Sequence, residues 1–328
     1  MTMAQVSVVI PTYNRAALVL EAVGSVLAQT VQDVEVIVVD DGSTDNTRQR
    51  IAAVNDTRVC YVYQSNAGCA AARNAGLARC RGRYVAFLDS DDLWPEHFLE
   101  SMVRRLQAHP QAGCAYCSVV KAFADGHTEP SYGSADCRSG WITAALFERG
   151  FIWLSGALFR AAVWQDFFFD EALSCSGEDS DALLRLSVRV PYLYVDEVTV
   201  VHRMTEDSVS RRQGVNPNRL LSLERFYYDL GGRDIIPRPA ARRRLSHACR
   251  RLAEDYRRRG SRRAARAFYV RALRYWPFDM RLYVGWCRSG WLRHDVQPAW
   301  RKPAALPAPR RYLGQEPTTG PADGEGTG

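Results

Sequence analysis

The sequence predicts an α/β fold: an open, mostly parallel sheet with helices on both faces, followed by a C-terminal helical extension. From residue 5 to about 107, short β-branched runs alternate with longer helical stretches, and this alternation favours a parallel sheet. From about residue 240, apolar residues recur at helical spacing, which is typical of helices that bury one face. With 328 residues, 47% of them apolar, the chain is long enough for one large domain and an appendage.

Four compact apolar runs in the first part of the chain are expected to be buried strands. Each is bounded by polar or turn-forming residues, as strands that are covered on both faces usually are. These runs are residues 6–10, 34–39, 59–63 and 84–88.

The stretches between and after these runs are expected to be helices, at residues 16–28, 44–54, 68–80 and 95–108. Ser43 or Thr44 is expected to cap the second helix, because a short oxygen-bearing side chain can accept from the free amides at a helix start. Pro95 favours the first turn of the fourth helix, where its missing N–H costs nothing.

The middle of the chain has a weaker pattern. Residues 110–175 contain only short apolar runs, and the Gly-, Ser- and Asp-rich stretch 125–139 predicts a mobile loop. An acidic cluster at 177–181 then precedes a helical stretch at 182–188. Carboxylates also complement the dipole at a helix start, so a purely structural role for this cluster is an alternative.

Two amphipathic stretches near the C-terminus predict a helical hairpin with a break at Gly260 and Ser261. Their apolar faces are Leu245, Cys249, Leu252 and Tyr256 in the first helix, and Ala265, Phe268, Ala272 and Trp276 in the second. The tail that follows, 301–328, is rich in Pro and Gly and is expected to be disordered.

Charge is distributed unevenly along the chain. Residues 1–200 carry 16 basic and 24 acidic side chains, whereas residues 201–328 carry 27 and 12. The basic half, rich in Arg, Trp and Tyr, favours a peripheral contact with an anionic membrane surface. Solvated arginines on a helical hairpin that packs against the first domain are the alternative.

Several classes of protein are excluded by their missing signatures. The sequence contains no Gly-Lys of a P-loop, no Gly-x-Ser-x-Gly and no His-Glu-x-x-His. No apolar run reaches the roughly 18–20 residues that a membrane-spanning helix needs, and the N-terminus lacks the pattern of a secretory signal. We therefore expect a cytoplasmic location, in which the protein can also contact the inner face of the membrane peripherally.

Five carboxylates follow the ends of predicted strands, where an open parallel sheet binds its ligands. They are Asp40, Asp41, Asp89, Asp91 and Asp92. Two like charges 4 Å apart repel by about 4 kcal/mol at an effective dielectric constant near 20. A divalent cation is therefore expected to compensate this cluster.

Five ordered blocks carry a resemblance to a known family. They are residues 6–15 (VSVVIPTYNR), 38–45 (VVDDGSTD), 66–76 (NAGCAAARNAG), 87–92 (FLDSDD) and 177–181 (GEDSD). Together they resemble family 2 glycosyltransferases of the GT-A fold, which is Rossmann-like, and the resemblance extends from residue 5 to about 210.

The resemblance implies an inverting transfer of a sugar from a nucleotide-sugar, expected to be a UDP-sugar, to a saccharide or lipid-linked acceptor in envelope polysaccharide assembly. Pro11, Tyr13 and Asp41 match positions that hold the nucleotide base, with Asp41 accepting from the uracil ring nitrogen. The full set of substrate-binding residues that the resemblance implies is Pro11, Thr12, Tyr13, Asn14, Asp41, Asn66, Arg73, Asp89 and Glu178.

The resemblance also implies a manganese or magnesium ion, which Asp91 would bind directly and Asp89 directly or through water, and a general base, Asp179. Inversion without a covalent intermediate needs one such base on the acceptor side. Many family members place a third metal contact in an Arg-x-His run, but Thr205 occupies that His position here. His202 is either its substitute or a packed structural residue, and the second interpretation is favoured.

These expectations define four parts of the chain: a catalytic domain at 1–210, a connecting segment at 211–238, a helical extension at 239–300 and the tail at 301–328. The residues leave two other functions open. A nucleotidyltransferase also combines an Asp-rich metal site with an α/β sheet, although its usual Gly-rich loop is missing after the first strand. A basic membrane- or nucleic-acid-binding protein with a vestigial site is the other; we expect no nucleic-acid partner.

Overall fold

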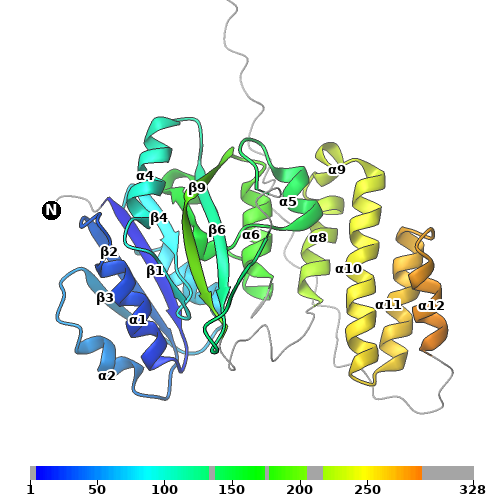
Figure 1. Cartoon of the computed structure of the whole chain (residues 1–328), viewed down its shortest axis with the longest axis horizontal. Helices are drawn as coiled ribbons and strands as arrows, with labels where there is room; N and C mark the ends of the chain where they lie inside the picture. Colours follow the sequence, from blue (N-terminus) through cyan, green and yellow to red (C-terminus); the bar gives the residue numbers. More distant parts are fainter. Residues whose placement is uncertain (1–4, 133–136, 174–176, 205–216, 290–328) are drawn as a thin grey trace, which may run out of the picture.

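The computed structural model describes residues 5–132, 137–173, 177–204 and 217–289. Its first part alternates strands and helices as predicted (Figure 1). β1 pairs in parallel with β2 and β4, and β2 pairs in parallel with β3. The elements of this part are β1 (Val6–Thr12), α1 (Ala16–Leu27), β2 (Val34–Asp41), α2 (Thr47–Ala52), β3 (Val59–Gln64), α3 (Cys69–Leu77) and β4 (Tyr84–Phe87).

The second part completes one mixed sheet. Its strand order is β3-β2-β1-β4-β8-β6-β9-β5, with β7 paired to β6. β8 runs antiparallel to both β4 and β6, whereas β9 runs parallel to β6. The elements are β5 (Asp92–Leu93), α4 (Phe98–Ala108), β6 (Cys114–Ala122), β7 (Thr128–Pro130), α5 (Thr143–Arg149), β8 (Ala157–Arg160), α6 (Glu178–Leu186) and β9 (Tyr192–Arg203), with short 3-10 helices at Leu154–Gly156, Ala161–Trp164 and Glu171–Leu173.

Helices cover both faces of the sheet, which confirms the predicted fold class. Alternate residues of each strand point to opposite faces: Val8 belongs to the core beneath α1, α2 and α4, and Val9 to the core beneath α3 and α6. Gly76 lets α3 approach closely, because a Cβ there would lie 2.3 Å from Cγ1 of Val9.

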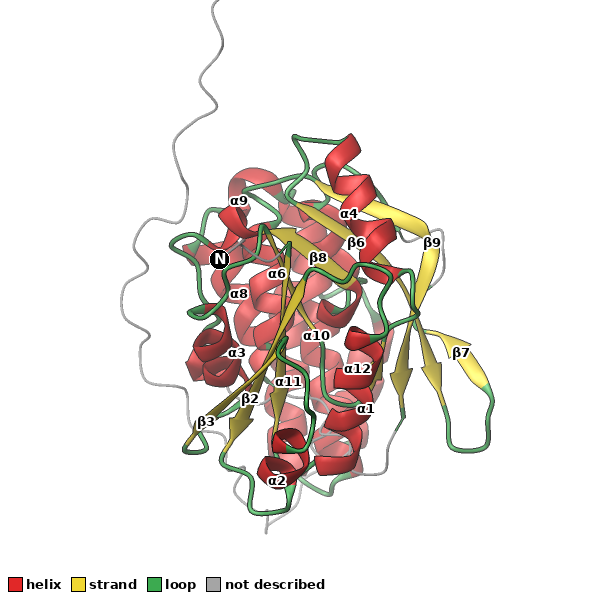
Figure 2. Ribbon diagram, turned by 90° about the vertical axis from the view of Figure 1, so that its left-hand side faces the viewer, coloured by secondary structure: helices red, strands yellow, loops and turns green. Residues whose placement is uncertain are grey.

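The stretch 125–139, expected to be a mobile loop, is partly a β-hairpin. β7 pairs antiparallel with the end of β6, and Figure 2 shows this hairpin standing out from the rest of the sheet. Main-chain pairing therefore orders part of a segment whose composition indicated only a loop.

The C-terminal region is helical, as predicted, and the α10–α11 hairpin breaks at Gly260 (Figure 1). The segment 211–238, expected only to connect, contains α8 and α9 in its described part, and Leu223 and Phe226 of α8 join the core beneath α6. The helices are α8 (Asn218–Asp229), α9 (Gly232–Ile235), α10 (Arg238–Arg258), α11 (Arg262–Tyr275) and α12 (Met280–Arg288).

The helical extension shares its core with the sheet domain. Leu245 and Leu252 of α10 belong to the same buried cluster as Phe147 of α5 and Leu183 of α6. The expected boundary near residue 210 and the tail 301–328 lie outside the described residues. Within the described ranges, no helix is both long and apolar enough to cross a bilayer.

Candidate active site

The loops after β1 and β2 are tied together by side chains. Asn14 adopts a left-handed backbone (φ 51°), and its Oδ1 accepts from the amide of Thr44 at 2.7 Å, while its own amide donates to Oγ of Ser43 at 2.9 Å. The prediction that Ser43 or Thr44 caps α2 is wrong. Both residues are engaged with Asn14, and Asp45 accepts from the amide of Thr47 at 3.0 Å instead.

Asp41 is buried at the end of β2 and is held by the loop before α3. Its Oδ1 accepts from Nε2 of Gln64 at 2.7 Å and from the amide of Ala67 at 2.9 Å, and its Oδ2 accepts from the amide of Gly68 at 2.9 Å. Asn66 Nδ2 donates to the main-chain oxygen of Asp41 at 2.9 Å. Because a carboxylate offers about four acceptor positions, one remains after these three bonds.

Gly42 makes this junction possible, and its replacement by Ala gives a test. Its φ is +83°, and a Cβ would lie 2.7 Å from the amide nitrogen of Asn66. Gly126 has nearly the same φ, +86°, with open space around a Cβ. Gly126→Ala should therefore lower the free energy of unfolding by about 1–2 kcal/mol, the cost of left-handed backbone alone. Gly42→Ala should cost more in urea denaturation, and equal losses would show that the contact with Asn66 is unimportant.

The remaining residues of the first block differ in exposure. Pro11 and Thr12 end β1 and are buried, and Oγ1 of Thr12 has no hydrogen-bond partner within the described structure. The side chain of Tyr13 is 47% exposed. Tyr13 thus offers an accessible ring beside the Asp41 loop, while Pro11 and Thr12 shape the strand end.

Arg73 of α3 joins the end of β4 to the start of α6. Its Nη2 lies 2.7 Å from Oδ1 of Asp89, and its Nη1 lies 2.8 Å from Oε1 of Glu178. Arg73 and Glu178 are buried, whereas the side chain of Asp89 is 34% exposed. Burial raises the pKa of Glu178, and the charge of Arg73 opposes that rise.

Asp179, the predicted base, begins α6 beside Glu178. It is half-buried, and its Oδ1 accepts from the amide of Ser180 at 2.6 Å. Its charge contributes to the raised pKa values of both Arg73 and Glu178, so it lies in the same electrostatic cluster. The structure thereby places the predicted donor residue Asp89 and the neighbour of the predicted base, Glu178, on one arginine.

The other two carboxylates of the Asp-rich turn also have partners. Oδ2 of Asp91 lies 2.7 Å from Nη1 of Arg15, and Oδ1 of Asp92 lies 2.6 Å from Nδ1 of His202. His202 packs on Trp153 with ring centroids 4.5 Å apart. Burial lowers the pKa of His202, but its hydrogen bond to Asp92 and the charges of the three aspartates of the turn together raise it. The contacts with Asp92 and Trp153 support the packed structural role for His202. Thr205 lies outside the described residues.

The chain itself supplies partners for the five carboxylates, so their mutual repulsion is smaller than the sequence alone predicts. Arginines contact Asp89 and Asp91, a histidine contacts Asp92, loop amides and Gln64 contact Asp41, and Tyr61 with the amide of Ser43 contacts Asp40. In the described ranges, no group of three or more His, Cys, Asp or Glu side chains is arranged to hold a metal. Asp89 and Asp91 each keep a second oxygen that Arg73 and Arg15 do not occupy, so a metal role for them stays a prediction.

Three residues that the sequence did not single out hold the Asp-rich turn. Besides Arg15, Nε of Arg203 donates to the main-chain oxygen of Asp91 at 2.8 Å, and Oγ of Ser155 accepts from the amide of Asp89 at 3.1 Å. Arg15 directly follows Asn14 in the first block of the resemblance, and this position could have indicated a place in the site. Arg203 begins the run that the resemblance matches to Arg-x-His, whereas Ser155 gave no signal, because its contact with Asp89 spans 66 residues.

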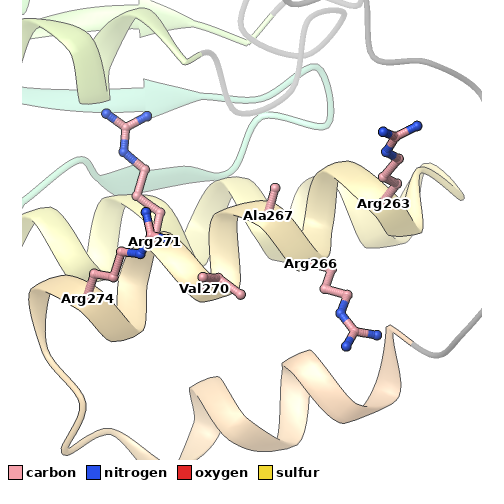
Figure 3. Close-up of a pocket in the computed structure, with 6 residues that line it drawn as sticks. All are labelled: Arg263, Arg266, Ala267, Val270, Arg271 and Arg274. Carbon is pink, nitrogen blue, oxygen red and sulfur yellow. The ribbon is translucent and has the colours of Figure 1, made fainter.

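The arginine-rich surface of α11 forms an open groove away from these residues, lined by Arg263, Arg266, Arg271 and Arg274 together with Ala267 and Val270. Figure 3 shows these arginine side chains pointing in different directions. Arg266 lies over the ring of Trp286 at 4.4 Å, and Arg271 pairs with Glu224 at 2.5 Å. Arg263 also has an interaction partner, so at least three of the four are engaged, and the groove does not focus its charges on one centre.

Residues 7–165 match the family model of glycosyl transferase family 2. This segment belongs to glycosyl transferase family 2. The match covers the Asp41 loop, Arg73 and the Asp-rich turn, and it favours a glycosyltransferase over the nucleotidyltransferase and binding-protein alternatives.

Curated relatives agree with the family. A glycosyltransferase of Nostoc sp. is 42% identical over 112 residues, which cover 33% of this chain and 35% of the relative. Glycosyltransferase GlyA of Streptococcus pneumoniae is 28% identical over 223 residues, which cover 63% of this chain and 32% of the relative. The chain thus spans only about a third of the length of these family 2 relatives.

Solved structures share the fold. Staphylococcus aureus TarS 1-349, in complex with UDP-GlcNAc, has a TM-score of 0.58 at 18% identity, covering 87% of this chain and 79% of that chain. The mannosyltransferase PcManGT of Pyrobaculum calidifontis, in complex with GDP-Man and Mn²⁺, has a TM-score of 0.51 at 18% identity, covering 88% and 76%. This likeness shows the GT-A fold for the family 2 chain.

Proposed function

We propose that this family 2 chain transfers a sugar from a nucleotide-sugar, preferably a UDP-sugar, to an acceptor hydroxyl with inversion at the anomeric carbon. The observation that carries the proposal is the buried bridge of Arg73 between Asp89 and Glu178. It connects the strand end where the sheet would receive the donor with the helix start that carries Asp179.

The donor part of the proposal rests on Asp41, Tyr13 and the Asp-rich turn. Asp41 keeps about one acceptor position, which a uracil ring N–H would fill, and the exposed ring of Tyr13 lies on the adjoining loop. Asp89 and Asp91 would hold a divalent cation, which, when bound, neutralises charge on the diphosphate. The complexes of TarS with UDP-GlcNAc and of PcManGT with GDP-Man and Mn²⁺ support this donor class.

In the proposed reaction, Asp179 accepts the proton of the acceptor hydroxyl. The acceptor oxygen then bonds to the anomeric carbon as the bond to the nucleotide diphosphate breaks on the opposite face, which inverts that carbon. Only one base is required, as for the water that inverting glycosidases activate. Glu178 is a poorer candidate, because Arg73 holds its Oε1 and it is only 5% exposed.

The acceptor is proposed to be a saccharide or a lipid-linked saccharide, as in envelope polysaccharide assembly. A cytoplasmic site with peripheral membrane contact through the arginine-rich C-terminal helices remains a prediction. The open groove on α11 is the surface on which that prediction depends.

Calorimetry with a panel of nucleotide-sugars, with and without manganese, tests the donor assignment. We expect UDP-sugars to bind, and chelation of the metal to weaken binding by about tenfold or more, equivalent to about 1.4 kcal/mol. Asp91→Asn should abolish the metal effect, whereas Asp196→Asn, on an exposed part of β9, should preserve it. Equal affinity with and without metal would contradict the cation, and binding of no panel member would contradict the donor class.

A further inference from the structure

Two arginines from the C-terminal helices, Arg219 and Arg244, lie next to the start of α6, and a third, Arg251, follows Arg244 on α10. Arg219 of α8 is half-buried, Arg244 of α10 is 9% exposed, and Arg251 lies two turns further along α10. Within the described residues, none of the three forms an ion pair with a carboxylate. Burial and the positive charges of Arg219 and Arg251 lower the pKa of Arg244 to about 10, with Glu148 opposing them.

The hydrogen bonds that these side chains do make leave most of their donors available. Nε of Arg244 donates to the main-chain oxygen of Phe147 at 3.0 Å, and Nη2 of Arg219 donates to that of Arg149 at 3.5 Å. Both acceptors lie in the last turn of α5, where a positive charge is favourable. A guanidinium carries five N–H donors, so one bond each satisfies neither group.

A small cavity opens between α5, α6, α8 and α10 at this point. Arg219, Arg244, Ser180 and Ser222 supply its polar lining, and leucines of α5, α6 and α8 supply much of the rest. Ser180 directly follows Asp179 in the chain. The cavity therefore brings Arg219 and Arg244 beside Ser180, the residue next to the proposed base.

Tyr132 lies close enough to Asp179 and to these arginines for all of their charges to affect its pKa. Burial raises its pKa, the charges of Arg219, Arg251 and Arg244 lower it, and the charge of Asp179 raises it. A Cβ at Gly177, the residue before Glu178, would lie 3.4 Å from the amide nitrogen of Arg219. Arg219 therefore lies beside the residue that precedes Glu178, at the start of α6.

We propose that Arg219, Arg244 and Arg251 form a phosphate-binding subsite for the acceptor, so that the acceptor hydroxyl reaches Asp179 from a phosphate-bearing molecule. Three guanidinium groups offer more N–H donors than one carboxylate can accept from, and this number of donors suits the several oxygens of a phosphate. The acceptor role in this inference rests on the proposed glycosyl transfer. The binding of phosphate by the three arginines does not depend on that proposal.

Calorimetric titration of the full chain with glycerol 3-phosphate tests the subsite, with UDP and manganese present in saturating amounts to fill the donor site. Glycerol and glycerate serve as the uncharged and carboxylate probes. We expect heat of binding only with the phosphate probe, or at least tenfold weaker binding of glycerate. Losing a hydrogen bond to a charged group should make Arg244→Gln bind glycerol 3-phosphate about 10-fold to 100-fold more weakly.

Two further variants make this result interpretable. Arg251→Gln, at an exposed position, should also weaken binding and does not depend on refolding around a buried change, whereas Arg274→Gln on α11 should bind like the unaltered chain. Dioctanoyl phosphatidic acid, titrated in parallel, distinguishes a lipid source of the phosphate, which should bind more tightly than glycerol 3-phosphate, from a soluble source, which should not.

Unchanged binding in both Arg244→Gln and Arg251→Gln would overturn the subsite and leave these arginines with a role only at the end of α5. Equal binding of glycerate and glycerol 3-phosphate would overturn the choice of phosphate. Failure of the glycosyltransferase proposal would look different: the phosphate probe would still bind in an arginine-dependent way, while no nucleotide-sugar bound in the donor experiment.

Discussion

Replacing Asp179 with Asn is expected to lower the turnover number by about 10²–10⁴-fold, the usual contribution of a general base. The affinity for the nucleotide-sugar should change little, because Asp89 and Asp41 on the donor side keep their contacts. Asn is nearly the same size as Asp, and its carbonyl oxygen can accept the bond from the amide of Ser180. The loss would therefore reflect proton transfer and not a disturbed helix start.

Steady-state kinetics together with calorimetric donor binding separates these effects. Asp196→Asn makes the same chemical change at an exposed position of β9 and should leave both quantities as they are. Full turnover in Asp179→Asn would remove this residue as the base. A large loss of donor affinity in the same variant would assign it to binding, because catalysis requires an effect on the transition state that exceeds the effect on the bound substrate.

The elements of the fold that the sequence predicted best are those whose evidence is local. β1, β2 and β4 are almost entirely buried, so each appears as a continuous apolar run, and β1 and β2 were predicted to within two residues of their observed ends. The expectation that residues 59–63 form a buried strand is wrong, because β3 is the edge strand of the sheet and its residues are half-buried or exposed. β8 could not be predicted in the same way. It has only four residues, and its place between β4 and β6 depends on contacts with distant segments.

In the candidate site, the sequence predicted which carboxylates lie at the strand ends but not what neutralises them. Arg73 and Glu178 are 105 residues apart, and Asp92 and His202 are 110 apart, so no local pattern reports either pair. The repulsion expected among the carboxylates of the strand ends is reduced by arginines from other segments that pack against them. The same limitation applied to Arg244, whose burial against the end of α5 appears only when α10 packs there.

Replacing Arg73 with Met is expected to lower the free energy of unfolding by about 3–5 kcal/mol, the cost of leaving one member of a buried ion pair uncompensated. Glu178 is only 5% exposed, and its Oε2 already lacks a hydrogen-bond partner within the described structure. Met retains much of the volume that lies near the ring of Phe169, so packing should account for little of the loss. Urea denaturation at pH 7 measures the effect.

The dependence of this loss on Glu178 and on pH identifies its cause. Because burial raises the pKa of Glu178 in the folded state, the folded chain binds that proton more tightly than the unfolded chain does. The free energy of unfolding of Arg73→Met should therefore recover as pH falls through this raised pKa, and the double variant Arg73→Met, Glu178→Gln should be more stable than Arg73→Met alone. Arg79→Met, an exposed arginine just after α3, is the control for the lost charge. A loss that neither acid pH nor Glu178→Gln reduces would mean that Arg73 stabilises the fold by packing, and the bridge could no longer be the feature that joins donor and base.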